Sequence, residues 1–130
     1  MKDKTHSLLI IDDDEHTLES MEKYFRMRGY VVTSAANGLD ALKLMEHRSD
    51  FDLIITDIVM PDVSGIAVIS VAKKMLPDLP LIAITGWGEH PEGLASEANA
   101  DVVVKKPVQL EALEKTALKL LKSMPADSSI

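Results

Sequence analysis

Short apolar runs alternate with longer amphipathic stretches along the chain, and this alternation occurs five times. The runs are continuously apolar and rich in branched side chains, which is typical of parallel strands that helices cover on both faces. We therefore expect five strands, at residues 8–11, 30–32, 53–55, 81–84 and 102–104.

Most of the intervening stretches carry apolar residues at helical spacing. In the first, Leu18, Met21 and Phe25 fall on one stripe, and Gly29 supplies a stop after the last turn. The segment 86–100 is less regular, because glycines and a proline precede its short helical pattern. The predicted helices are 14–28, 39–47, 65–75 and 109–122, with a short one near 94–98.

The same spacing predicts which face of each helix is buried. In the helix 39–47, the inward residues are Leu42 and Met45. In the helix 65–75, they come from Ala67, Val68, Val71 and Met75. In the last helix, the inward stripe consists of Leu110, Leu113, Ala117, Leu120 and Leu121. The charged residues expected on its solvent face are Glu111, Glu114, Lys115, Lys119 and Lys122.

The regular alternation of strand and helix predicts a single α/β domain of the doubly wound (βα)5 type, with a five-stranded parallel sheet and helices on both faces. We assign residues 1–122 to this domain and residues 123–130 to a tail or the start of a linker. In open sheets of this kind, ligands bind beyond the C-terminal ends of the strands. We therefore expect the chemistry at that edge.

Composition narrows the class of protein. A chain of 130 residues that is 46% hydrophobic can bury one core, and the absence of cysteine excludes a disulfide scaffold and a cysteine nucleophile. The net charge of -7 disfavours direct binding of nucleic acid. The apolar run at 8–11 is too short for a signal peptide or a membrane span, so we expect a cytoplasmic protein with no membrane contact.

Polar residues follow four of the five predicted strands. A single acid at such a place commonly caps the next helix, as Asp13 or Asp14 could do here. Asp12, Asp13 and Asp57, however, would converge, and clustered carboxylates raise one another's pKa unless a cation lies among them. Oxygen ligands without histidine favour Mg²⁺, or Mn²⁺ as its substitute, and Mg²⁺ commonly binds a phosphate oxygen as well. The pattern therefore predicts a site for a phosphoryl group.

At these positions the chain resembles the receiver domain of two-component response regulators, over about residues 7–122. The match consists of an acidic pair, a D-x-x-M-P motif with a glycine beyond it, a threonine and a Lys-Pro pair, at Asp12–Asp13, Asp57–Pro61, Gly65, Thr85 and Lys106–Pro107. The resemblance implies a flavodoxin-like fold and a phosphoprotein that works in signalling. It does not imply an enzyme that turns over a substrate.

The resemblance also implies a phosphoacceptor and a metal site. Asp57 would accept a phosphoryl group from a phosphohistidine, and the chain's own catalysis would be limited to this transfer and to autodephosphorylation. Asp13, Asp57 and the backbone carbonyl of Val59 would bind Mg²⁺ directly, and Asp12 would hold it through a water molecule. Because the Val59 side chain is apolar and cannot orient an attacking water, we expect the phosphoryl group to persist beyond seconds.

Two further residues receive roles from the resemblance. Lys106 would contact the phosphoryl group, with a cis peptide before Pro107, and its choice over Lys105 rests on the adjacent proline. Thr85 would be the switch, because its hydroxyl can hydrogen-bond a phosphoryl oxygen. The family commonly has an aromatic residue where this chain has Val103, so we expect the output to depend on the backbone and the fourth helix instead.

The expected partners are a histidine kinase or histidine phosphotransfer protein as donor and a downstream effector or output domain, with a homodimer as a further option. Two alternatives remain open. One is a phosphate-independent pseudo-receiver, which Val103 supports. The other is a phosphatase of the haloacid dehalogenase kind, but its D-x-D-x-[TV] signature fails because His16 fills the fifth position counted from Asp12.

Overall fold

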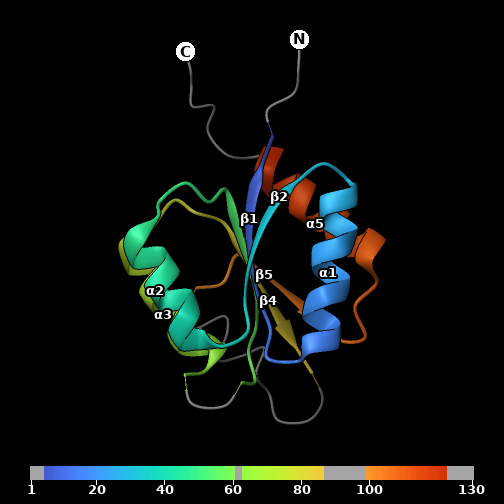
Figure 1. Cartoon of the computed structure of the whole chain (residues 1–130). Helices are drawn as coiled ribbons and strands as arrows, with labels where there is room; N and C mark the ends of the chain where they lie inside the picture. Colours follow the sequence, from blue (N-terminus) through green and yellow to red (C-terminus); the bar gives the residue numbers. More distant parts are fainter. Residues whose placement is uncertain (1–4, 61–62, 87–98, 123–130) are drawn as a thin grey trace, which may run out of the picture.

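The computed structural model describes residues 5–60, 63–86 and 99–122, which contain one five-stranded sheet. All pairings are parallel, and the strands lie in the order β2-β1-β3-β4-β5 (Figure 1). The strands are β1 Ser7–Ile11, β2 Val31–Ala35, β3 Leu53–Asp57, β4 Leu81–Thr85 and β5 Val102–Lys105. The doubly wound parallel sheet that the sequence predicts is confirmed.

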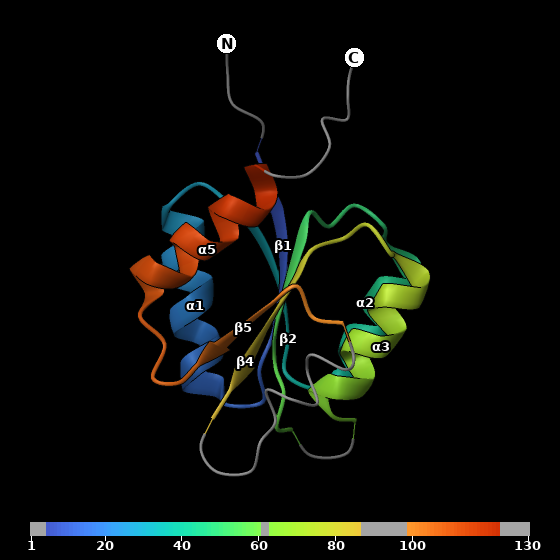
Figure 2. The ribbon, with the colours of Figure 1, turned by 180° about the vertical axis from the view of Figure 1, so that it is seen from behind.

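Helices cover both faces of the sheet. Their bounds are α1 Glu15–Met27, α2 Gly38–His47, α3 Gly65–Met75 and α5 Leu110–Lys122. Helices α1 and α5 lie on one face, and α2 and α3 lie on the other (Figure 1, Figure 2). The predicted helix near 94–98 and the predicted tail 123–130 lie outside the described residues.

Two hydrophobic clusters form the core, one on each face of the sheet. Along β1, Leu9 and Ile11 join the cluster that includes Val68 of α3, whereas Leu8 and Ile10 join the cluster that includes α1 and α5. Side chains of a strand alternate between its two faces, which explains why one continuous apolar run supplies both clusters. Because all five residues of β1 are buried, packing on both faces fixes this strand and the position of the residues that follow it at the C-terminal edge of the sheet.

Local signals fix where the first helix begins and ends. The carboxylate of Asp14 accepts a hydrogen bond from the backbone N–H of Thr17, so Asp14 is the N-cap of α1. Gly29 has a φ of +97°, a left-handed conformation that favours glycine, and it follows the last turn as predicted. Since Asp14 caps the helix, Asp12 and Asp13 stand between β1 and the cap.

The strands extend further toward their C-terminal ends than the apolar runs indicate. Asp57 is the last residue of β3 and pairs with Ile84, and Thr85 is the last residue of β4 and pairs with Lys105. Parallel pairing continues through these polar residues because backbone groups form it, irrespective of side chain. The site residues Asp57 and Thr85 therefore sit on the sheet itself.

The predicted buried faces of three helices need correction. In α2, Ala41 is buried with Met45, and Leu42 is only partly buried. In α3, Met75 is 42% exposed, and Ile69 and Ala72 are buried with Val68. The apolar residues of α3 occupy most of its circumference, so the sequence pattern does not indicate which side of the helix faces the sheet. The close approach of Gly65 to the end of β3 determines that side instead.

The prediction for Glu114 of α5 is also wrong, since this residue is buried and does not face solvent. Its carboxylate accepts hydrogen bonds from Tyr24, Arg28 and Tyr30, which the pattern of α5 alone cannot indicate. None of the helices within the described ranges combines the length and the apolar character that crossing a membrane requires.

Candidate functional site

The candidate site lies at the C-terminal ends of the three adjacent strands β1, β3 and β4 and of the edge strand β5. Asp12 and Asp13 follow β1 directly, and Asp57 ends the neighbouring strand β3. Thr85 ends β4, and Lys106 follows β5. The structure thus brings together five side chains that the sequence spreads over 95 positions, from residue 12 to residue 106.

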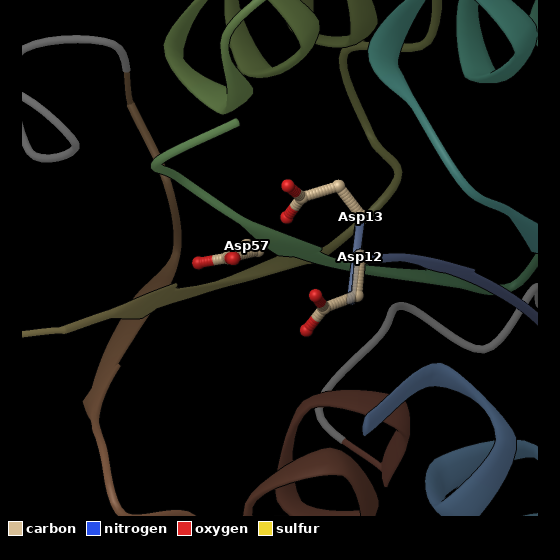
Figure 3. Close-up of side chains that lie close together, drawn as sticks. All are labelled: Asp12, Asp13 and Asp57. Atoms are coloured by element: carbon tan, nitrogen blue, oxygen red, sulfur yellow. The ribbon is translucent and has the colours of Figure 1, made fainter. Parts of the chain in front are cut away.

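Three carboxylates form the acidic part of the site. One oxygen of each of Asp12, Asp13 and Asp57 lies within 4.8 Å of the others, and Figure 3 shows the three groups side by side at the strand ends. Asp12 is fully buried and Asp57 is 3% exposed, whereas Asp13 is exposed. The cluster therefore has two buried members and one member open to solvent.

The surroundings disfavour the charged forms of the two buried carboxyl groups. Burial raises the pKa of Asp12 from 3.8 to about 6, although the backbone N–H of Asp14 donates to it at 2.9 Å and lowers the pKa in part. Burial also raises the pKa of Asp57, and the Lys106 ammonium partly counteracts this. In each case the loss of hydration is the largest cause.

Two oxygens of the cluster lack a partner among the described residues. Asp12 Oδ2 and Asp57 Oδ1 are buried and accept no hydrogen bond there. An ionised oxygen that is buried without a partner is costly, and a divalent cation is a partner that can neutralise several such oxygens at once. Carboxylate oxygens are also the ligands that Mg²⁺ prefers. The residues present therefore fit a magnesium site.

Lys106 supplies the positive charge of the site. Its Nζ atom lies 3.4 Å from Oδ2 of Asp57, and its backbone N–H donates to the Thr85 carbonyl at 2.8 Å. The Lys106–Pro107 peptide is cis, as the resemblance implied. Lys106, which the adjacent proline singled out from its neighbour Lys105, is thus the lysine that reaches Asp57.

Thr85 places a hydroxyl at the same edge. Its side chain is fully buried, and Oγ1 has no hydrogen-bond partner among the described residues. A buried hydroxyl without a partner costs free energy, which a phosphoryl oxygen within reach would recover. Val103, at the position where the family commonly has an aromatic residue, pairs with Ala83 and packs against the core cluster of α2 and α3.

The backbone beyond Asp57 depends on a glycine. A Cβ atom at Gly65 would lie 2.1 Å from the Asp57 carbonyl oxygen, and the Gly65 N–H donates to Ile58 at 2.9 Å. Only glycine permits this approach of α3 to β3. Val59 is 65% exposed, and the role of its carbonyl as a metal ligand stays a prediction.

One feature beside the site escapes sequence reasoning. A groove of about 660 Å³ lies between α1 and the segment after β5, and Met21, Lys106, Pro107 and Val108 are among the residues that line it. Its two walls are far apart in the sequence, and no local pattern indicates that they meet.

Comparisons with known proteins agree with this geometry. The response regulator receiver domain family matches residues 8–118. The response regulator SaeR of Staphylococcus epidermidis is 41% identical over 104 residues, which are 79% of this chain and 44% of that protein. The chain thus spans less than half the length of this curated relative.

Solved structures are similar as well. A CheY-like response regulator receiver domain protein from Methanospirillum hungatei JF-1 has a TM-score of 0.89 and 28% identity, over 96% of this chain and all of that one. The signal receiver domain of a signal transduction histidine kinase from Syntrophus aciditrophicus has a TM-score of 0.86 and 26% identity, over 97% of both chains. The sequence match and the arrangement of strands and acidic residues lead to the same conclusion: this chain belongs to the response regulator receiver domain family.

Proposed function

We propose that the chain accepts a phosphoryl group from a phosphohistidine onto Asp57 and thereby controls a partner or an output domain. The observation that carries this proposal is the contact between Lys106 and Asp57, whose Oδ1 has no partner within the described parts of the chain. A buried carboxylate that keeps a free oxygen beside an ammonium group is equipped to act as a nucleophile toward an anionic phosphoryl group.

The transfer itself needs no further reactant. A carboxylate oxygen of Asp57 attacks the phosphorus atom, a P–O bond forms, and the P–N bond to the imidazole of the donor breaks. The imidazole leaves with the electron pair of the broken bond and takes up a proton from solvent. Lys106 offsets the negative charge of the phosphoryl oxygens, so that the catalytic effect consists mainly of positioning and charge compensation.

Asp12, Asp13 and Asp57 would hold Mg²⁺, with the Val59 carbonyl as a further ligand. When bound, the ion supplies positive charge that neutralises the carboxylates and the phosphoryl oxygens. The support for this assignment is the cluster of three carboxylates within 4.8 Å, together with the buried oxygens of Asp12 and Asp57 that have no partner in the ranges the structure describes.

Thr85 would report the phosphorylation to the rest of the domain. Its buried hydroxyl, which has no partner among the described residues, gains one when a phosphoryl group is present on Asp57. Because Thr85 ends β4, any movement of its side chain acts on the segment that follows this strand. A ligand shifts a conformational equilibrium only through such differential contacts.

The expected phosphodonor is a histidine kinase or a histidine phosphotransfer protein. The groove that Lys106 helps to line offers an apolar surface, next to Met21 and Val108, for the donor that brings its histidine to Asp57. The partner that responds to phosphorylation would be a downstream effector or an output domain. In this structure the end of α5 lies at the opposite end of the molecule from the site (Figure 1).

The alternatives account for less of the structure. A pseudo-receiver that works without phosphate gives no role to two buried carboxylates, each with an oxygen that finds no partner in the described structure, and such groups are costly to retain. A phosphatase of the haloacid dehalogenase kind would use Asp12 as its nucleophile, but its D-x-D-x-[TV] signature fails because His16 fills the fifth position counted from Asp12.

Mass spectrometry of the protein after incubation with acetyl phosphate and Mg²⁺ tests the proposal. The wild-type protein is expected to gain a phosphoryl group, and the Asp57→Asn variant is expected to gain none. Asp78→Asn, which removes an exposed acid outside the site, is the matched control and should label like the wild type. Equal labelling of Asp57→Asn would remove Asp57 as the acceptor.

A further inference from the structure

Glu114 is the buried charged side chain that the proposed function leaves unexplained. Among the described residues, the buried charged side chains are Asp12, Asp57 and Glu114, and the first two belong to the candidate site. Glu114 is 7% exposed and lies in the second turn of α5. A carboxylate is stable in such a place only when hydrogen-bond donors replace its lost hydration.

Three side chains donate hydrogen bonds to this carboxylate. Two come from the C-terminal end of α1, and the third comes from the residue before β2. Tyr24 Oη and Arg28 Nε donate to Oε1 at 2.9 and 3.0 Å, and Tyr30 Oη donates to Oε2 at 3.1 Å. Between the two tyrosines, the buried ring of Phe25 meets each of them edge to face. We call Glu114 with Tyr24, Arg28 and Tyr30 the Glu114 hub.

The hub joins α5 to the last turn of α1 and to the residue before β2. Both helices continue from segments of the candidate site, since α1 follows Asp12 and Asp13 through the cap and α5 follows Lys106. The views in Figure 1 and Figure 2 agree that α1 and α5 lie side by side on one face of the sheet. The hub therefore connects the elements that carry the acidic pair and the lysine.

Strand β5, which Lys106 follows directly, depends on α5 for its position. Strand β5 is an edge strand and pairs with β4 alone. Val102 and Val104 of β5 pack in the same core cluster as Leu113, the neighbour of Glu114. A shift of α5 would therefore carry β5 and the following residue with it, whereas Asp57 is held in the centre of the sheet.

We infer that Glu114 is a positioning residue for the phosphorylation of Asp57: by fixing α5 against α1, it holds the Lys106 ammonium within reach of the Asp57 carboxylate. The inference rests on the proposed function, because it needs a reaction for Lys106 to assist. It assigns Glu114 no contact with the phosphoryl group. Its effect reaches the site through the placement of one helix and one edge strand.

The test compares the rate of labelling at saturating acetyl phosphate with the affinity for Mg²⁺ measured by calorimetry. Glu114→Ala is expected to lower the labelling rate roughly five- to tenfold, because small displacements of a charge-compensating group are costly to a reaction of this kind. The affinity for Mg²⁺ should stay close to that of the wild type, since the three carboxylates end or follow the inner strands β1 and β3 and not the edge strand β5. Glu114→Gln should restore most of the rate, because its amide can accept from Tyr24 and donate to the Tyr30 oxygen.

Met45→Ala is the control for a loss of stability alone, since this buried residue of α2 lies on the opposite face of the sheet. A full labelling rate in Glu114→Ala would overturn the inference, and so would an equal fall in Met45→Ala. If Glu114→Ala does not fold, the double variant Tyr24→Phe with Tyr30→Phe removes two donors, keeps the aromatic packing, and is judged by the same criteria.

Labelling of the wild-type protein distinguishes a failure of the proposed function from a failure of the role assigned to Glu114. A wild type that takes up no phosphoryl group removes the proposed function, and the inference with it. A wild type that labels while Glu114→Ala labels equally fast removes the inference alone.

Discussion

The Nζ atom of Lys106 lies 3.4 Å from Oδ2 of Asp57, although 49 residues separate the two in the sequence. The ammonium group partly counteracts the rise in pKa that burial imposes on the Asp57 carboxyl group. It therefore favours the charged, nucleophilic form of Asp57 before any phosphoryl group arrives.

Removal of this charge should slow phosphorylation. Lys106→Met keeps a long side chain but removes the ammonium, so the labelling rate with acetyl phosphate and Mg²⁺ is expected to fall roughly tenfold to a hundredfold. Mass spectrometry of samples quenched at successive times measures the rate. Lys105→Met is the neighbouring control at the end of β5 and should keep the wild-type rate. A wild-type rate in Lys106→Met would show that the contact has no part in the transfer.

The pKa of Asp12 predicts how stability depends on pH in protein without divalent cations. The folded carboxyl group holds its proton up to about pH 6, whereas the ordinary value is 3.8. The unfolding free energy therefore falls as the pH rises from 3.8 to about 6, and the penalty is complete above this window. Asp12→Asn keeps the acceptor for the Asp14 N–H and carries no charge.

At neutral pH, Asp12→Asn is thus expected to raise the unfolding free energy by about 1–3 kcal/mol. Urea denaturation in the presence of a chelator measures this gain, which should vanish near pH 3.8. Excess Mg²⁺ should reduce this gain, because the ion stabilises the protein with all three carboxylates more than the variant that has lost one of them. A variant that is less stable than the wild type at neutral pH without metal would contradict the pKa assignment.

The close approach at Gly65 predicts a strong effect of one methyl group. In Gly65→Ala, the new Cβ would lie 2.1 Å from the Asp57 carbonyl oxygen and 2.6 Å from the Ile58 Cα, so α3 or the end of β3 must move. We expect a loss of at least about 2 kcal/mol in unfolding free energy and slower phosphorylation. Gly86→Ala is the control, because among the described residues its Cβ would meet only Lys106 Cδ, at 3.8 Å. Equal stability of both variants would refute the steric argument.

The buried hydroxyl of Thr85 predicts opposite effects on stability and on signalling. Thr85→Val preserves the shape of the side chain and removes an oxygen that has no partner within the described ranges. The unfolding free energy of the unphosphorylated protein should therefore rise by about 1 kcal/mol. Phosphorylation should still occur, but the amide chemical shifts that change in the wild type should change much less around β4. An undiminished response in Thr85→Val would exclude the hydroxyl as the switch.

The sequence predicts the sheet well because the central strands β1, β3 and β4 are buried along their whole length and contain short apolar runs. It predicts the acidic cluster because the ends of parallel strands meet at one edge, so that Asp12, Asp13 and Asp57 had to converge. The choice of Lys106 over Lys105 required the family resemblance, since a strand pattern does not reveal where its last residue points.

Tertiary contacts explain what the sequence misses. Glu114 occupies a position that is polar on a helical wheel, and its burial depends on donors about 84 to 90 residues earlier in the chain. The rotation of α3 depends on the contact of Gly65 with Asp57, because the helix is apolar on most sides. In both cases the deciding interaction joins residues that no local pattern relates.

Intact-mass measurements of the wild-type protein can decide whether phosphorylation of this site depends on a bound cation. The protein is incubated with acetyl phosphate, once with Mg²⁺ and once with a chelator, and the uptake of a phosphoryl group is measured in each case. If three carboxylates and Lys106 form a cation-dependent phosphoacceptor site, about one phosphoryl group per chain should appear with Mg²⁺ and none with the chelator. Labelling that is the same in both conditions, or absent in both, would contradict it.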